Sequence, residues 1–100
     1  MKVEEEVQII KDAVDTYGFE SQRKILQEEC AELIVAASHY DRGRPGAYDN
    51  FLEELADVDI MISQMVYALQ GNIDVWKEQK LTRLKDKIKK HKKEHGTAHN

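Results

Sequence analysis

Residues 51–69, FLEELADVDIMISQMVYAL, decide the fold. Their apolar side chains recur at every third or fourth position: Phe51, Leu55, Val58, Ile62, Met65 and Leu69. This period is typical of an amphipathic α-helix, whereas a half-buried strand alternates at every second position. We therefore expect a helix that is capped by Asp49 and runs to about Leu69.

Two helices are predicted before this one. The first covers residues 3–17 and ends at Gly18, since glycine readily terminates a helix. The second follows Ser21, a residue suited to capping a helix N-terminus, and runs to about Tyr40. Residues 41–48 contain Pro45 and two glycines, so they are expected to form the loop that leads to the next helix.

A fourth helix is predicted to begin near Asp74, and the chain after residue 90 is expected to be a flexible basic tail that contains histidines. His91, His95 and His99 recur at every fourth position, which would suit a transition metal, but Gly96 interrupts the series. The 100 residues fit one domain, predicted at residues 1–90, with the tail at 91–100. Because no strand pattern occurs, the predicted fold class is all-α, with a protomer resembling a four-helix bundle.

Composition indicates a cytoplasmic protein that does not enter membranes. Cys30 is the only cysteine, so no disulfide can form within the chain, which fits a reducing compartment. The first ten residues carry three glutamates where a signal peptide would have basic residues and an apolar run. No stretch approaches the roughly 18 consecutive apolar residues of a membrane span.

Charge is divided unevenly along the chain. Residues 1–76 hold 16 acidic and 6 basic side chains, a net charge of −10. Residues 77–93 hold 9 basic and 2 acidic side chains, a net charge of +7. A lysine-rich helix could touch nucleic acid through phosphate contacts. The acidic body and the lack of aromatic residues between these lysines argue against nucleic acid as the main partner.

Four carboxylates lie where apolar side chains are expected. On helical wheels, Glu29 and Glu54 fall inside the apolar stripes, with Glu32 and Asp57 about 60° to the side one turn later. Each glutamate taken singly could be an ordinary solvated residue. Together, four carboxylates between two helices would repel one another and be costly to bury. A hard cation such as Mg²⁺ would resolve the conflict, and the absence of Cys or His from this stripe argues against zinc.

The same residues resemble a known family. Residues 28–32 match the pattern EExxE, residues 54–57 match ExxD, and 21 residues separate the two motifs. Over about residues 21–85 the chain resembles the all-α nucleotide pyrophosphohydrolases, and most closely the MazG-like enzymes. That group also includes dimeric dUTPases, dCTP pyrophosphatases and phosphoribosyl-ATP pyrophosphohydrolase.

The resemblance implies a magnesium-dependent hydrolase that cleaves a nucleoside triphosphate between the α and β phosphates to give a monophosphate and pyrophosphate. It implies four ligands for Mg²⁺, for which Mn²⁺ may substitute: Glu29, Glu32, Glu54 and Asp57. A bound metal would neutralise phosphate charge and help to activate water. Glu28 is the first candidate for the general base and Glu53 the second, although either could be a solvated helix residue.

Basic residues of the fourth helix are candidates for binding the substrate. Lys77, Lys80 and Arg83 would contact phosphates, and Trp76 would stack on the base, although a solvated basic face is equally compatible with the pattern. The small core and the resemblance both predict a homodimer or homotetramer. The alternative functions are phosphoribosyl-ATP pyrophosphohydrolase and a non-enzymatic helical interaction module.

Overall fold

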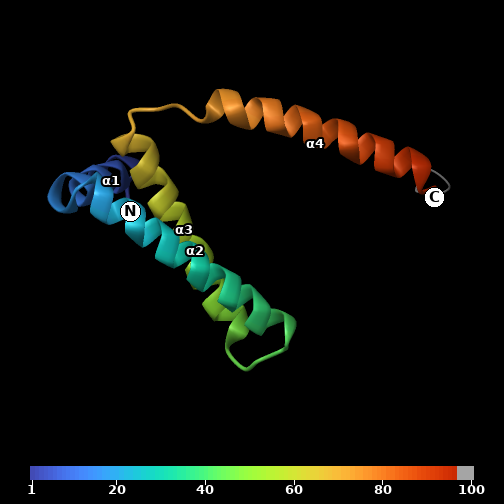
Figure 1. Cartoon of the computed structure of the whole chain (residues 1–100), viewed down its shortest axis with the longest axis horizontal. Coiled ribbons are helices and arrows are strands. Elements are labelled where there is room, and N and C mark those ends of the chain that lie inside the picture. Colours follow the sequence, from blue (N-terminus) through green and yellow to red (C-terminus); the bar gives the residue numbers. More distant parts are fainter. Residues whose placement is uncertain (97–100) are drawn as a thin grey trace.

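The computed structural model describes residues 1–96, which form four α-helices and no strand (Figure 1). The helices are α1 (Val3–Tyr17), α2 (Phe19–Asp41), α3 (Ala47–Ala68) and α4 (Asp74–Glu94). The predicted all-α class is thereby confirmed, and each predicted helix is present. Within these 96 residues, no helix is both long enough and apolar enough to span a lipid bilayer.

Glycines rather than capping side chains set two of the helix boundaries. Gly18, at φ 91°, ends α1 and directly precedes α2, and its carbonyl accepts the amide of Gln22 at 3.1 Å. Gly46, at φ 77°, plays the same part before α3. The predictions that Ser21 and Asp49 cap these helices are therefore wrong. These glycines, both with positive φ, turn the chain within one residue, and α2 and α3 each begin two residues before the predicted cap.

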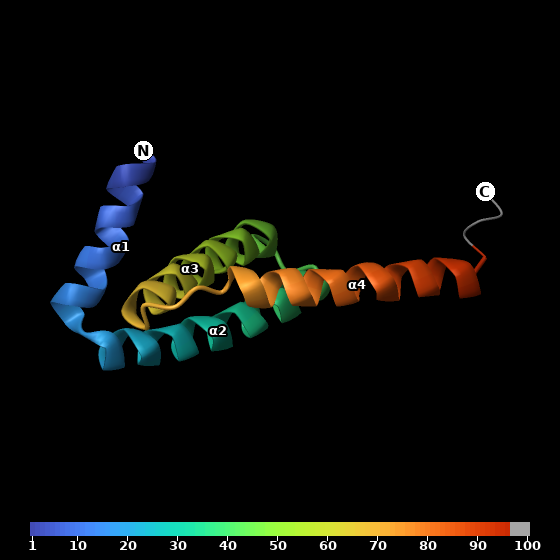
Figure 2. The same ribbon diagram turned by 90° about the horizontal axis from the view of Figure 1, so that it is seen from above.

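The helices α2 and α3 form an antiparallel hairpin, which is the main packing unit of the chain (Figure 2). Near the loop end of the hairpin, the rings of Tyr40 and Phe51 pack together with 5.6 Å between their centroids. Phe51 therefore uses its place on the apolar stripe of α3 to contact α2. At the other end α1 packs mainly on α3, where the hydroxyl of Tyr67 donates a hydrogen bond to Asp15 at 3.0 Å. The buried apolar side chains among the described residues are Val14, Ala36, Ala47, Met61 and Met65.

Helix α4 packs against none of the other three helices within residues 1–96 and projects away from them (Figures 1 and 2). The radius of gyration is accordingly 17.9 Å, against about 13 Å for a compact domain of this length. The helix continues to Glu94, so the first four residues of the predicted tail are helical. His99 lies outside the described residues.

Candidate metal centre

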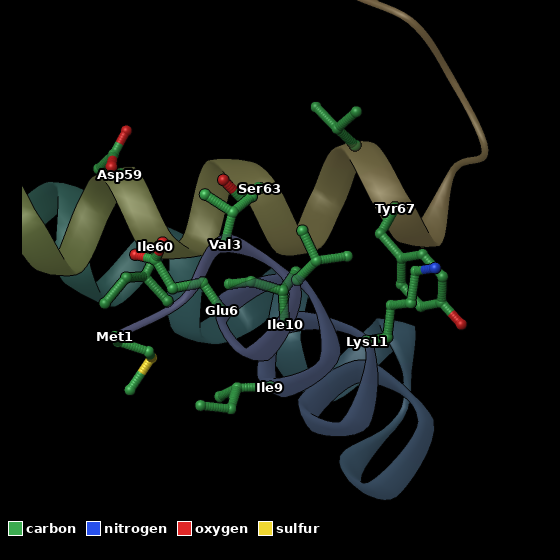
Figure 3. A pocket seen from close by; sticks show the side chains of 12 residues that line it. Met1, Val3, Glu6, Ile9, Ile10, Lys11, Asp59, Ile60, Ser63 and Tyr67 are labelled. Carbon is green, nitrogen blue, oxygen red and sulfur yellow. The ribbon is translucent and has the colours of Figure 1, made fainter.

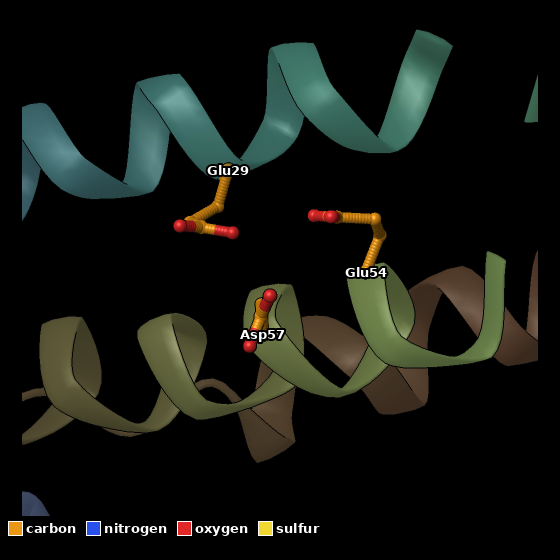
Figure 4. A group of neighbouring side chains, drawn as sticks. All are labelled: Glu29, Glu54 and Asp57. Carbon is orange, nitrogen blue, oxygen red and sulfur yellow. The ribbon is translucent and has the colours of Figure 1, made fainter. Parts of the chain in front are cut away.

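The hairpin brings together carboxylates from both of its helices. Glu29 on α2 faces Glu54 and Asp57 on α3 across the seam between the helices (Figure 4). One carboxylate oxygen from each of the three lies within 4.8 Å of the others. Glu29 thus joins two residues that lie 25 and 28 positions later in the sequence, and we call these three residues the acidic cluster.

The acidic cluster is partly withdrawn from solvent. Glu29 and Glu54 are half-buried and Asp57 is exposed. The Oε2 atoms of both glutamates are buried and have no hydrogen-bond partner among the described residues. A buried oxygen without a donor is unfavourable, so these two atoms lack the compensation that burial normally requires.

Burial and mutual repulsion hold a proton on the cluster. Loss of solvation, followed by the charges of Glu32, Asp57 and Glu54, raises the pKa of Glu29 from 4.5 to about 7. Burial also raises the pKa of Glu54, and Glu32 and Asp57 add to that effect. At neutral pH Glu29 is therefore partly protonated in the protein alone, as expected for acids crowded together without a cation.

Glu32 lies beside the acidic cluster rather than within it. It is exposed on α2, yet its charge is the largest electrostatic contribution to the raised pKa of both Glu29 and Glu54. With His39, Asn50 and Glu54 it lines an open hollow of about 330 Å³ between α2 and α3. The four predicted ligands are thus neighbours, and the hollow opens onto two of them, Glu32 and Glu54, from the loop side of the hairpin.

This donor set fits a hard divalent cation. All the converging atoms are carboxylate oxygens, which Mg²⁺ and Mn²⁺ prefer, and three to four carboxylates leave positions for water or phosphate oxygens. A cation would also supply a partner for the two buried Oε2 atoms. Among residues 1–96, no Cys or His joins the three carboxylates of the acidic cluster, so the site does not resemble a zinc centre.

The two predicted general bases lie outside the acidic cluster. Glu28 and Glu53 are both exposed, each adjacent in sequence to a cluster glutamate. Glu28 lines an open hollow with Tyr17 and Lys24 near the corner between α1 and α2. Successive helical side chains diverge by about 100°, so neither base candidate can point in the same direction as its cluster neighbour.

The predicted phosphate and base contacts are not brought to the acidic cluster within one chain. Lys77, Lys80 and Arg83 are exposed on α4, and Trp76 is 62% exposed at its start. Because α4 packs on no other helix of the described chain, these side chains lie apart from the α2–α3 seam. The segment after α3 sets this direction, since Gln70 adopts a left-handed backbone at φ 50°.

One polar pair in the same seam was not predicted from the sequence. The amide of Gln22 donates a hydrogen bond to Gln64 at 2.7 Å, and both side chains are only 5% exposed. Gln22 lies seven residues before Glu29 and Gln64 seven residues after Asp57, so the pair continues the cluster's stripe by two turns. Extending the helical wheels beyond the carboxylates would have revealed it.

No protein-family model, no curated protein and no solved structure matches this chain.

Proposed function

We propose that the protein is a magnesium-dependent nucleoside triphosphate pyrophosphohydrolase of the MazG-like kind. It would act in the cytoplasm and hydrolyse its substrate between the α and β phosphates to a monophosphate and pyrophosphate. The observation that carries the proposal is the convergence of Glu29, Glu54 and Asp57 on one point between two helices. These residues come from the EExxE and ExxD motifs, whose order and spacing match that group of enzymes.

Glu29, Glu32, Glu54 and Asp57 would hold the metal. The buried Oε2 atoms of Glu29 and Glu54 support this role, because each needs a positively charged or proton-donating partner. When bound, magnesium would neutralise charge on the triphosphate and favour attack at phosphorus. The chain itself has no basic residue in the acidic cluster, so without a cation it would repel a polyphosphate.

The attacking water would lose its proton to a carboxylate that is not occupied by metal. Glu28 and Glu53 are exposed and flank the acidic cluster in sequence, so they remain the first and second candidates for this base. Each would need to reach the water from the edge of the seam, because neither points into it.

Substrate binding would use α4 in an oligomer. We propose a homodimer or homotetramer in which Lys77, Lys80 and Arg83 contact phosphates and Trp76 stacks on the base. The distance of α4 from the cluster of its own chain supports an assembly in which a second chain completes the site. The net charge of +7 on residues 77–93 would also attract a polyanionic substrate.

The test is a panel of ribonucleoside and deoxyribonucleoside triphosphates with Mg²⁺, assayed for pyrophosphate and orthophosphate. We expect pyrophosphate and a monophosphate, identified by phosphorus NMR. Glu29→Gln and Asp57→Asn should each lower the rate by orders of magnitude, because even changes to the residues that orient metal ligands cost roughly 10–100-fold. Glu5→Gln, a matched change on the exposed face of α1, should leave it unchanged.

Other outcomes separate the alternatives. Hydrolysis of phosphoribosyl-ATP without hydrolysis of the triphosphate panel would identify the chain as that enzyme. No magnesium-dependent release of pyrophosphate from any substrate would reject an enzymatic role and favour the helical interaction module.

A further inference from the structure

Two histidines stand together at the far end of α4. The rings of His91 and His95 are stacked, with 4.2 Å between their centroids and an angle of 26° between their planes. Both side chains are exposed, and α4 carries them away from the hairpin of α2 and α3 (Figure 1). The proposed pyrophosphohydrolase reaction uses neither residue.

The last turn of α4 holds the two rings on one face of the helix. Because His91 and His95 are four residues apart, they lie within about 40° of each other on the helical wheel. The amide of His95 donates a hydrogen bond to the carbonyl of His91 at 2.9 Å, which closes that turn. The helical spacing thus holds through His95, and Gly96 follows with a positive φ of 69°.

The separation of the rings suits a shared metal ion. Two imidazole nitrogens that bind one tetrahedral ion, each at about 2.0–2.1 Å, are roughly 3.4 Å apart. Rings centred 4.2 Å apart can reach this separation with small side-chain rotations, because each ring carries its nitrogens at its edge. Imidazole suits Zn²⁺, Ni²⁺ and Cu²⁺, whereas Mg²⁺ prefers oxygen ligands.

The charges around the histidine pair are mixed. Lys92 and Lys93 lie between the two histidines in sequence and disfavour a cation. Glu94 also lies between them, and the last carbonyls of α4 carry the partial negative charge of a helix C-terminus, so both of these favour a cation. The lysines are exposed, so solvent and salt weaken their repulsion.

Other nitrogen and sulfur ligands within residues 1–96 are separated from one another. His39 is half-buried in the last turn of α2, and Cys30 lies nine residues before it, more than two turns away. The groove between α1 and α3 is walled mainly by apolar side chains such as Val3, Ile10 and Ile60 (Figure 3). Within this part of the chain, the end of α4 is therefore the place where two imidazoles can bind one ion.

We propose that His91 and His95 form a transition-metal site, separate from the acidic cluster, that binds one ion through two imidazole nitrogens and completes the coordination with water. Cu²⁺ should bind there more tightly than Ni²⁺ or Zn²⁺, and Mg²⁺ should not bind there. A bound ion joins the two ends of one turn, so it stabilises the end of a helix that packs on no other helix of residues 1–96.

Copper binding to the full chain tests the proposal. All chains carry Cys30→Ala, which removes the thiol. Calorimetry gives the affinity for Cu²⁺, and pulsed electron paramagnetic resonance counts the imidazoles bound to it. We expect two imidazoles in the parent chain. His91→Gln and His95→Gln should each lower the affinity at least tenfold and leave fewer than two imidazoles on the ion. An unchanged affinity in either variant would overturn the proposal.

The matched control keeps the number of histidines and changes their spacing. His95→Gln combined with Lys93→His places the second ring two residues after His91, about 160° around the helix, where it cannot share an ion with His91. This variant should bind no better than His95→Gln alone. His39→Gln and His99→Gln should each leave the affinity within twofold. Full binding by the respaced variant, or a tenfold loss from His39→Gln or His99→Gln, would contradict the proposed site.

Circular dichroism measures the consequence for the helix. Cu²⁺ should increase the helical ellipticity of the parent chain and leave that of His95→Gln unchanged, and equal responses from the two chains would count against the proposal. Glu54→Gln should keep both the copper affinity and this response, because it alters the acidic cluster and not the histidine pair. Loss of copper binding in Glu54→Gln would place the ion at the acidic cluster and overturn the inference. A failure to hydrolyse nucleotides would leave all these copper results unaffected.

Discussion

Lowering the pH from 8 to 6 should weaken magnesium binding by about tenfold, because Glu29 must lose its proton before it can bind the ion. The pKa of this carboxyl is about 7, raised first by burial and then by the charges of Glu32, Asp57 and Glu54. Glu29 is therefore about nine-tenths ionised at pH 8 and about one-tenth ionised at pH 6, a difference of ~1.4 kcal/mol in binding free energy. Burial also raises the pKa of Glu54, so its effect on metal binding has the same sign.

Isothermal titration calorimetry with Mg²⁺ or Mn²⁺ measures this directly. Repeating the titration at pH 7 in two buffers of different ionisation enthalpy gives the number of protons released, which should be at least about one half per ion. Glu29→Gln removes the group with the pKa of about 7 and should reduce the pH dependence, while Glu5→Gln should retain it in full. An affinity that stays constant between pH 6 and 8, with no proton release, would refute the assignment of Glu29 as a buried ligand.

The remaining predictions concern stability. Because the pKa of Glu29 is raised in the folded protein, its contribution to the free energy of unfolding is fully present below pH 4.5 and is lost as the pH rises through about 7. The metal-free protein should therefore melt at a lower temperature at pH 8 than at pH 5. At pH 8, Mg²⁺ or Mn²⁺ should raise the melting temperature, and a chelator should reverse that increase. Glu54→Gln should weaken the response to metal, and melting curves that do not change when metal is added would contradict the metal site. Gln64→Leu should cost about 1–3 kcal/mol because it strands the Gln22 amide, and adding Gln22→Leu should recover much of that loss in a denaturant titration. Gly18→Ala should cost about 1–3 kcal/mol, because the backbone there, at φ 91° and ψ 152°, is one that only glycine adopts readily. Gly71→Ala, where φ is not positive, serves as the control.

Helical periodicity predicted what depends on local spacing. The apolar stripe of residues 51–69 indicated α3, and the placement of Glu29 and Glu54 within apolar stripes indicated that carboxylates would meet between two helices. The structure brings Glu29, Glu54 and Asp57 together as that pattern suggested. These features repeat every turn, so the sequence carries them redundantly.

Features that depend on single backbone torsions were not predictable in the same way. Ser21 and Asp49 have good capping chemistry, but Gly18 and Gly46, which both adopt positive φ, start α2 and α3 earlier. The direction of α4 depends on the segment that contains Gln70, a residue type that adopts positive φ infrequently. A helical wheel describes which face a helix buries, but it contains no information on where the chain turns after the helix ends.

The hydrogen bond between Gln22 and Gln64 also determines how the two long helices can slide past each other. A shift of α3 by one turn would place Gln22 opposite Met61 or Ala68, where a buried amide finds no comparable partner. An unpaired buried amide costs about 1–3 kcal/mol, so misaligned hairpins are disfavoured even when their apolar contacts are nearly as good. Because Glu29 and Asp57 lie two turns further along the same seam, the glutamine pair fixes the alignment on which a three-carboxylate binding geometry depends.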